Sequence, residues 1–434
     1  MAGPPCQTCR YSVLNNSARM ARIRHAREAP HQPMSRKSLR WFLAILMVTC
    51  SPALTAAVSP AQSSLAESFD SWFQQQVRED NVLGAAFAIV SREDIIRMGT
   101  AGYTDNDRKQ AINTDTAFRL ASVSKTFAAE LTAQMVRDGY LGWDDPVTLY
   151  VPTFRIKGDA SKIHIRHLLG QSTGLVPHAY DNLIEEGMPI SEIQTRMAEL
   201  SPVCAPGDCY SYQNSVFSLI QPVVEKIAAN SYANLVDQRI FKPLNMYTAS
   251  VGYDAFMATS NRAEPHVRSN GKWKTVPVLP NYYRVAPAAG VNASVQDMGK
   301  WLMAQLGANP QVIAPDMVNM LVTPRVRTPR DLYRKEWDRI LTDAHYGMGW
   351  RVYQLGDEQI AYHSGWVSGY RADVAWSATH NIGIVVLMNV ESTTINAMTT
   401  RFWELAFARL EPVVNTASAA GTSTASAGSQ GSPP

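Results

Sequence analysis

Two hydrophobic periodicities alternate along the chain, one typical of amphipathic helices and the other typical of buried strands. In the first helical pattern, Leu65, Phe69 and Phe73 recur every four residues and predict a helix with one buried face. Short apolar runs bounded by polar turns predict strands near both ends of the chain. The expected elements are helices over 65–77, 122–140 and 393–410, and strands over 82–90, 95–101, 349–353, 359–363, 370–376 and 382–389.

The middle of the chain, about 142–344, mixes short helical patterns with loops rich in proline and glycine. Strands on both sides of this middle predict one α/β domain built from the two ends of the chain, about 63–141 and 345–410, with a helical insertion between them. The expected folded unit therefore spans 58–410. Residues 411–434, which are mostly Ser, Ala, Gly and Thr, predict a disordered tail.

Positive charge is concentrated at the N-terminal end of the chain. Residues 1–41 carry eight Lys or Arg and one Glu, so the rest of the chain has a net charge of −4, although the whole chain is at +3. No basic stripe remains there to bind nucleic acid. Nucleic acid is therefore excluded as a partner.

The leader, residues 1–57, has the order of a signal peptide. Basic residues between Arg36 and Arg40 precede the apolar run 41–49, and small residues follow up to Ala57. The run is about half the roughly 20 residues that a spanning helix requires, so we expect no membrane span after cleavage. The pattern predicts export to the periplasm or beyond. An uncleaved anchor, and translation from Met34 instead of Met1, remain alternatives.

Two cysteines lie in the expected folded unit, Cys204 and Cys209, on either side of a Pro-Gly turn. In an oxidising compartment a disulfide across this turn is plausible, and free thiols are the alternative. Because the loop is short, the disulfide would stabilise the fold by only about 2 kcal/mol.

A nucleophile motif, Ser122-Val123-Ser124-Lys125, stands at the start of the second predicted helix. Residues three apart share a helix face, so the Lys125 ammonium is expected beside the Ser122 hydroxyl. A serine alcohol needs such a neighbouring base or cation to act as a nucleophile. A second S-x-x-K runs from Ser269 to Lys272, but its Asn-Gly pair predicts a turn.

A tyrosine motif, Tyr212-Gln213-Asn214, follows the cysteine pair. A phenol near Lys⁺ has a lowered pKa, so Tyr212 is expected to accept the serine proton and later pass it on. Asn214 would offer its amide to a substrate carbonyl and to Lys125. The same spacing recurs at 180–182, in an expected loop, and at 232–234, in an expected helix.

A third motif, His363-Ser364-Gly365, ends a strand-like run and is followed by Trp366. A small residue and a glycine let a strand lie close to a substrate. The backbone N–H of Trp366, together with that of Ser122, is a candidate oxyanion hole. The expected substrate-binding residues are Asn214, His363, Gly365 and Trp366.

Taken in this order, the three motifs resemble those of the β-lactamase and penicillin-binding serine hydrolases, most closely the branch of class C β-lactamases, D-alanyl-D-alanine carboxypeptidases and related esterases. The resemblance covers about 65–410. It implies a β-lactamase-like three-layer α/β domain with an antiparallel sheet plus a helical domain, and an active site between the two. Further similar segments are 144–152, 165–175, 241–246, 289–297 and 346–350.

The resemblance also implies a chemistry. It implies an acyl-enzyme on Ser122 followed by hydrolysis of an amide, in a β-lactam or a D-Ala peptide of the cell wall, without metal or organic cofactor. Either Lys125 or Tyr212 would be the base. Class C β-lactamases carry a lysine where this chain has His363, and a largely neutral histidine attracts a substrate carboxylate less strongly. This departure argues against strong β-lactamase activity.

The sequence leaves other interpretations open. A carboxylesterase would use the same site, and a cell-wall-binding relative would keep the fold without turnover. The run 170–174 fits the G-x-S-x-G elbow of α/β-hydrolases around Ser172, but a loop follows it where the elbow needs a helix. His164 and His167 are three residues apart and could share a metal ion. However, the stretch 163–165 alternates like a strand, and no third ligand is obvious.

Overall fold

The computed structural model describes residues 58–413. The leader and the tail beyond 413 lie outside these residues, so the signal peptide, the alternative start and the disordered tail stay predictions. Within the described residues, no helix is long and apolar enough to cross a membrane.

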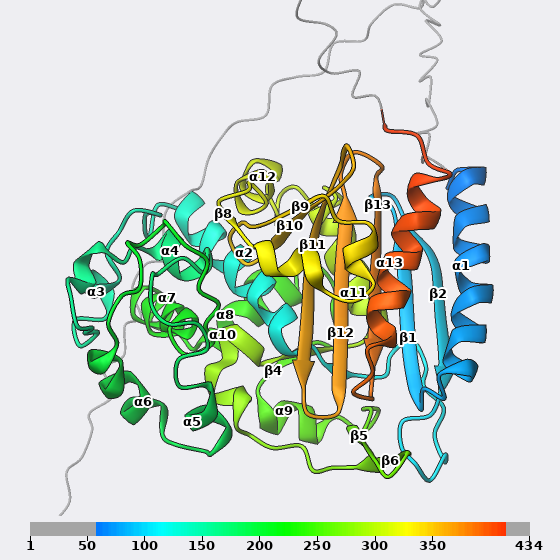
Figure 1. The fold of residues 1–434 in the computed structure, drawn as a ribbon, viewed down its shortest axis with the longest axis horizontal. Coiled ribbons are helices and arrows are strands. Elements are labelled where there is room, and N and C mark those ends of the chain that lie inside the picture. The colour runs from blue at the N-terminus through cyan, green and yellow to red at the C-terminus, as the bar shows by residue number, and fades with distance from the viewer. Residues whose placement is uncertain (1–57, 414–434) are drawn as a thin grey trace, which may run out of the picture. The chain divides into compact units, whose positions relative to one another are not determined.

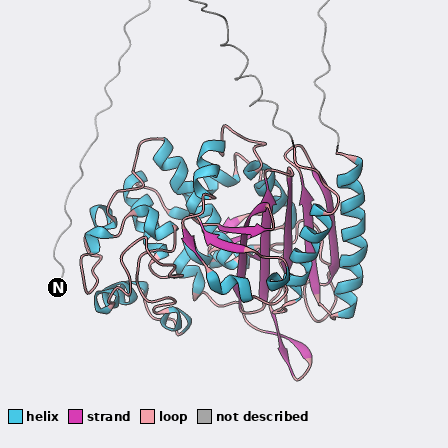
Figure 2. Cartoon of the chain, turned by 45° about the horizontal axis from the view of Figure 1, so that its top comes forward, coloured by secondary structure: helices cyan, strands magenta, loops and turns pink. Residues whose placement is uncertain are grey.

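An eight-stranded antiparallel sheet forms the centre of the α/β part (Figures 1 and 2). The first strand of the chain pairs with the last, so the two ends of the folded unit meet inside the sheet, as the sequence predicted. The sheet order is β2-β1-β13-β12-β11-β10-β9-β8. The strands are β1 (Gly84–Val90), β2 (Ile95–Gly102), β8 (Val326–Arg327), β9 (Asp343–Tyr346), β10 (Arg351–Leu355), β11 (Glu358–Val367), β12 (Tyr370–Ser377) and β13 (Ile382–Met388).

Helices cover both faces of this sheet, because its central strands are apolar on both sides. Along β1, Phe87 belongs to the hydrophobic core on one face and Ala88 to the core on the other. The core around Phe87 also contains Phe69 and Phe402 from the first and last helices. A helix from the middle of the chain packs on the opposite face and completes the three layers. These helices are α1 (Pro60–Glu79), α13 (Thr394–Phe407) and α11 (Val295–Gln305).

The remaining helices form the helical part beside the sheet (Figure 1). The helix expected over 122–140 begins after a single 3₁₀ turn, Ala121–Val123, and ends at Arg137. It is buried for most of its length and packs against both parts. The helices are α2 (Ser124–Arg137), α3 (Val147–Tyr150), α4 (Ile165–Leu169), α5 (Asp181–Glu185), α6 (Ile190–Arg196), α7 (Ile220–Ala228), α8 (Tyr232–Val236), α9 (Tyr253–Ala258), α10 (Ala286–Ala289) and α12 (Pro315–Leu321).

The structure differs from the expected boundaries at several elements; α1, for example, begins at Pro60, five residues before the expected start. Strand β11 continues four residues past the expected end at His363, because its pairing with β12 persists through the Ser-Gly pair. Part of the stretch 142–344, which we assigned to the helical part, packs with the sheet, namely α11, β8 and β9. The same stretch supplies small strands. β7 (Val291–Ala293) pairs with β4 (Ser250–Val251) on one side and with β3 (Phe118–Arg119) on the other, and β5 (His266–Ser269) and β6 (Lys272–Thr275) form a hairpin.

Candidate active site

Ser122 lies in the 3₁₀ turn that leads into α2. The preceding Ala121 has a φ of +49°, a left-handed conformation that is uncommon for a residue with a Cβ atom. Such a conformation persists where the surroundings enforce it, and here β11 and α10 both pack against the turn. The fold therefore holds the Ser122 side chain in a fixed position at the start of the helix.

The amino group of Lys125 donates to three oxygens. They are Ser122 Oγ at 3.2 Å, Asn214 Oδ1 at 2.7 Å and the backbone oxygen of Ala288 at 3.1 Å. The first contact lies within the S-x-x-K motif, and the second joins this motif to Y-x-N across 89 residues of chain; both were predicted from the sequence. The third comes from α10 and was not foreseen.

Burial decides the protonation of Lys125. Its side chain is fully buried, and this burial lowers its pKa to about 7, against the opposing effect of Asp181 and with a further lowering by Arg351. Near neutral pH a large fraction of the molecules therefore holds a neutral amine beside the serine hydroxyl. A neutral amine at this distance can accept a proton.

Tyr212 lies against the same amine, with Lys125 Nζ 4.6 Å from the centroid of its ring. Burial raises the pKa of the Tyr212 phenol, and the neighbouring Ser122 hydroxyl only partly offsets this effect. Our expectation of a lowered phenol pKa is therefore wrong, because desolvation outweighs the lowering by Ser122 and Arg351 in this buried site. Tyr212 stays protonated and is suited to donate or relay a proton.

Asn214 connects Lys125 to a carboxylate that the sequence analysis did not single out. While its Oδ1 accepts from Lys125, its Nδ2 donates to Asp181 Oδ2 at 2.9 Å, and the same carboxylate oxygen lies 2.9 Å from His178 Nδ1. Asp181 is the middle residue of the Y-x-N spacing at 180–182, which we expected in a loop, whereas α5 begins at Asp181. Spacing gave no signal for its role, because only the fold brings α5 beside Asn214.

His363 does not contact the cavity as we expected. Its side chain is buried, with Nε2 3.1 Å from the Tyr346 hydroxyl and Nδ1 2.9 Å from the backbone oxygen of Ser364. Burial, together with Arg351 and Lys125, lowers the His363 pKa well below its usual range. A neutral, enclosed imidazole holds β11 against β9 and offers no charge to a substrate.

Strand β11 presents a free backbone edge to the nucleophile. Strand β10 pairs with it only as far as Tyr362, while β12 pairs with it up to the two-residue turn at 368–369. Alternate residues of an antiparallel strand direct their N–H groups to opposite sides. The amides of Ser364 and Trp366 therefore point away from β12, toward the uncovered edge. The backbone N–H of Trp366, our candidate oxyanion donor, is therefore not used in pairing with β12.

Gly365 allows β11 to approach the nucleophile turn. A Cβ atom added there would clash with the backbone oxygen of Leu120 and would also press on Ala121. We expect Gly365→Ala to lower the free energy of unfolding by about 1–3 kcal/mol, as for other overpacked sites, and to slow acylation of Ser122 because the strand must move away. Thermal denaturation and a labelling time course measure the two effects.

Gly299 in α11 offers the matched control. An added Cβ there would lie 3.3 Å from Ile95 Cδ1, a contact that a small side-chain shift relieves. Because alanine also favours the helix, Gly299→Ala should leave stability unchanged or raised. An equally stable, equally reactive Gly365→Ala protein would contradict the tight approach inferred here.

A cavity of about 1350 Å³ opens beside Ser122 and is lined by Tyr212, Asn214, Ser364 and Trp366, among others. Its inner wall holds Arg351, which is paired with Asp331. The guanidinium group lies 5.8–5.9 Å from the ring centroids of three tyrosines. Sequence reasoning made no prediction for Arg351, although it directly follows 346–350, one of the segments that resemble the β-lactamase family. The cations that line the cavity are Arg327, Arg330, Arg334, Lys335, Arg351 and Arg371.

The structure contains the disulfide between Cys204 and Cys209, with the two Cα atoms 6.3 Å apart. The loop that it closes is bound to the segment 171–174, because Gly207 N donates to the Ser172 oxygen at 2.7 Å. Ser172 follows the short helix α4, is buried beneath this loop and leads into a turn. It therefore does not form the strand-to-helix elbow of an α/β-hydrolase.

The two histidines considered as metal ligands stack on one another, with their ring centroids 5.1 Å apart. His167 Nδ1 accepts from the backbone N–H of His164 at 3.1 Å, and α4 begins at Ile165, within the stretch that alternates like a strand. Over residues 58–413, no three His, Cys, Asp or Glu side chains are grouped so that they could hold a metal ion.

Comparison with known proteins identifies what the chain resembles. The family model "Beta-lactamase" matches residues 69–406. Protein flp of Staphylococcus aureus (strain N315) is 23% identical over 336 residues, which cover 75% of this chain but 63% of that protein. Esterase EstB of Burkholderia gladioli is 30% identical over 206 residues, 44% of this chain and 52% of the esterase. The octameric penicillin-binding protein homologue from Pyrococcus abyssi superposes with a TM-score of 0.68 at 21% identity, over 79% of each chain.

Proposed function

Because the chain belongs to the beta-lactamase family, we propose that it is a serine hydrolase that forms an acyl-enzyme on Ser122. One observation carries the proposal. Ser122 Oγ lies 3.2 Å from the amine of Lys125, whose pKa of about 7 makes it a base at neutral pH. The uncovered edge of β11 supports the proposal, because it offers N–H donors where the oxyanion would form.

The proposed reaction has two halves. Lys125 accepts the Ser122 proton, and Oγ attacks the substrate carbonyl carbon to give a tetrahedral oxyanion held by the N–H groups of Ser122 and Trp366. The C–N or C–O bond then breaks, and the leaving group receives the proton through the Tyr212 hydroxyl. A water molecule next attacks the acyl carbonyl carbon and gives its proton to Lys125. The bond between this carbon and Oγ then breaks, and Oγ takes the proton back, which releases a carboxylic acid and restores Ser122.

For the substrate we propose an amide, in a β-lactam or a D-Ala peptide of the cell wall, and the esters of carboxylic acids as a second candidate. The peptide proposal rests on the penicillin-binding homologue, whose fold this chain shares. The ester candidate is favoured by the likeness to Esterase EstB and by the neutral His363, which offers no cation to a substrate carboxylate. A non-catalytic wall-binding relative stays the third alternative.

Covalent labelling tests the proposal. A fluorescent fluorophosphonate or a fluorescent penicillin should attach to Ser122, and peptide mapping should find the label on that residue. Initial rates with a cephalosporin, a D-Ala-D-Ala peptide and a p-nitrophenyl ester then rank the substrate classes. A folded protein that neither takes the label nor turns over any of the three would favour the wall-binding relative.

We also propose that the protein is exported to the periplasm or secreted after its leader is removed. The disulfide between Cys204 and Cys209 supports this location, because such bonds persist in oxidising compartments. N-terminal sequencing of the protein made from the full chain in a bacterial host should find a start near residue 58. A start at residue 1 or 34 in the mature protein would contradict the proposal.

Asp181 has a positioning role in this scheme, and Asp181→Asn tests it. The carboxylate accepts from Asn214 and raises the Lys125 pKa, so its removal should lower that pKa. The acidic limb of the kcat/KM profile should therefore move below pH 7, and kcat should fall because the Asn214 amide loses its orientation.

Glu185→Gln is the control, because Glu185 lines the same cavity but is not bonded to Asn214. This variant should leave the acidic limb of the kcat/KM profile in place. A limb that stays fixed in Asp181→Asn would rule out the positioning role.

A further inference from the structure

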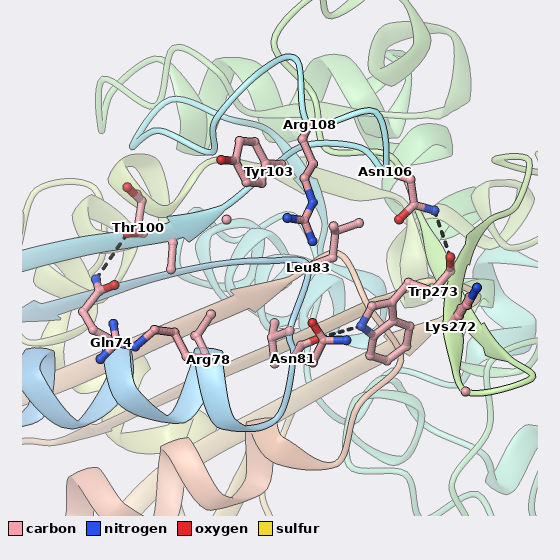
Figure 3. A pocket seen from close by; sticks show the side chains of 15 residues that line it. Gln74, Arg78, Asn81, Leu83, Thr100, Tyr103, Asn106, Arg108, Lys272 and Trp273 are labelled. Carbon is pink, nitrogen blue, oxygen red and sulfur yellow. Dashed lines mark hydrogen bonds between the residues drawn. The ribbon is translucent and has the colours of Figure 1, made fainter.

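A second cavity, of about 800 Å³, lies at the β2 edge of the sheet (Figure 3). Strands β1, β13 and β12 separate this edge from β11 and therefore from the catalytic site. The cavity is enclosed by the end of α1, by β2, by the loop that follows it and by the β5–β6 hairpin, which projects from the body of the molecule (Figure 2). Nothing in the proposed hydrolysis uses it.

Three cations line this cavity, and no acidic residue does. Within the described residues, Arg78, Arg108 and Lys272 have no salt-bridge partner, whereas Arg97 on the same edge strand is paired with Asp70. Figure 3 shows the guanidinium of Arg108 extending into the cavity, toward Leu83. Three uncompensated positive charges around one hollow attract an anion.

The cavity also has an aromatic wall that is held in place. The indole Nε1 of Trp273 donates to the backbone oxygen of Asn81 at 2.6 Å, and the Trp273 backbone oxygen accepts from Asn106 Nδ2 at 3.0 Å (Figure 3). Val82 and Leu83 add apolar surface to the same cavity. A fixed ring and an apolar lining suit a flat organic group, and the cavity volume lies within the ordinary range for small-molecule sites.

The second S-x-x-K sequence, Ser269 to Lys272, spans the turn of the β5–β6 hairpin. Asn270 and Gly271 both have positive φ, +49° and +75°, which is the backbone of a tight two-residue hairpin turn. The turn leads directly into β6, whose first two residues are Lys272 and Trp273. Ser269 to Lys272 is thus a turn, as predicted, and it leads into the strand that carries Trp273.

We propose that this cavity binds an organic anion, in which a carboxylate or phosphate is carried on a flat or apolar body. The cations hold the charged group, and Trp273 contacts the body. Because the cavity is remote from Ser122, the site is independent of the acyl-enzyme chemistry, and either proposal can fail without the other.

Benzoate and phenyl phosphate are suitable probes, with benzamide as the uncharged counterpart, in titrations followed by saturation-transfer NMR. The three variants described below are checked for folding by circular dichroism. We expect one or both anions to bind and benzamide to bind at least about 10-fold more weakly, as loss of charge-assisted hydrogen bonds predicts. The Arg108→Ala/Lys272→Ala protein should bind the two anions more weakly than the unaltered protein by a similar factor. Lys274→Ala, on the same strand but outside the cavity, should bind like the unaltered protein.

The arginines of the catalytic cavity supply the other control, because they too could attract an anion. Arg330→Ala/Arg371→Ala should bind the probes unchanged. Loss of binding in that variant, equal binding of benzamide, equal weakening by Lys274→Ala, or no binding of either anion at millimolar concentration would each overturn the proposal. A preference between benzoate and phenyl phosphate identifies the anion.

Discussion

Ser122→Ala is expected to reduce kcat/KM for every substrate by about 10⁴-fold or more, because it removes the atom that forms the acyl bond. The protein should remain folded, since alanine fits the same turn and the Lys125 amine keeps its bonds to Asn214 and Ala288. Initial rates with the best substrate of the panel, and loss of fluorophosphonate labelling, measure the effect. Circular dichroism confirms that the fold is retained.

Ser172→Ala is the matched control for that result. Ser172 is a buried serine of the other candidate motif; its backbone oxygen accepts from Gly207 of the disulfide-closed loop, and the Lys125 amine bonds to Ser122, Asn214 and Ala288 instead. We expect this variant to keep most of the activity. Full activity in Ser122→Ala combined with its loss in Ser172→Ala would reverse the assignment of the nucleophile.

The sequence predicted the fold well because its information is local and periodic. Uninterrupted apolar runs in β1 and β13 mark strands buried on both faces, and the helical spacing of Leu65, Phe69 and Phe73 marks a helix with one buried face. The motif order then indicated which segments converge. The boundaries were less certain, because pairing with β12 carries β11 through Ser364 and Gly365, two residues with weak strand preference.

Protonation and long-range contacts in the site could not be predicted in the same way. The pKa of a side chain depends on its burial, and sequence spacing does not report burial. The predicted direction of the Tyr212 pKa shift was therefore wrong, and the burial of the His363 side chain was missed. Asp181 and Arg351 belong to α5 and β10, and only the folded chain brings them to the motif residues. Such residues carry no signature in a single sequence.

The pH dependence of acylation separates Lys125 from Tyr212 as the base. If neutral Lys125 accepts the serine proton, kcat/KM rises with pH, tenfold per unit well below pH 7, and levels off above about pH 7, where the amine is deprotonated. The sign follows from the lowered pKa, because the active form is the unprotonated one. Lys125→Arg keeps the positive charge, but the guanidinium cannot deprotonate. The variant should therefore lose about 10³-fold or more of the rate, and its kcat/KM should show no rise with pH near pH 7.

Tyr212→Phe provides the contrast, because it removes the phenol and leaves the lysine. Burial raises the pKa of the Tyr212 phenol, so the hydroxyl stays protonated across the range in which Lys125 titrates. We expect the variant to lose about 10²–10⁴-fold of the rate through slower protonation of the leaving group, while the limb near pH 7 persists. An ester with a p-nitrophenolate leaving group needs little protonation and should suffer less than an amide. If the limb vanished in Tyr212→Phe and survived in Lys125→Arg, the phenol would be the base and the assignment of Lys125 would fail.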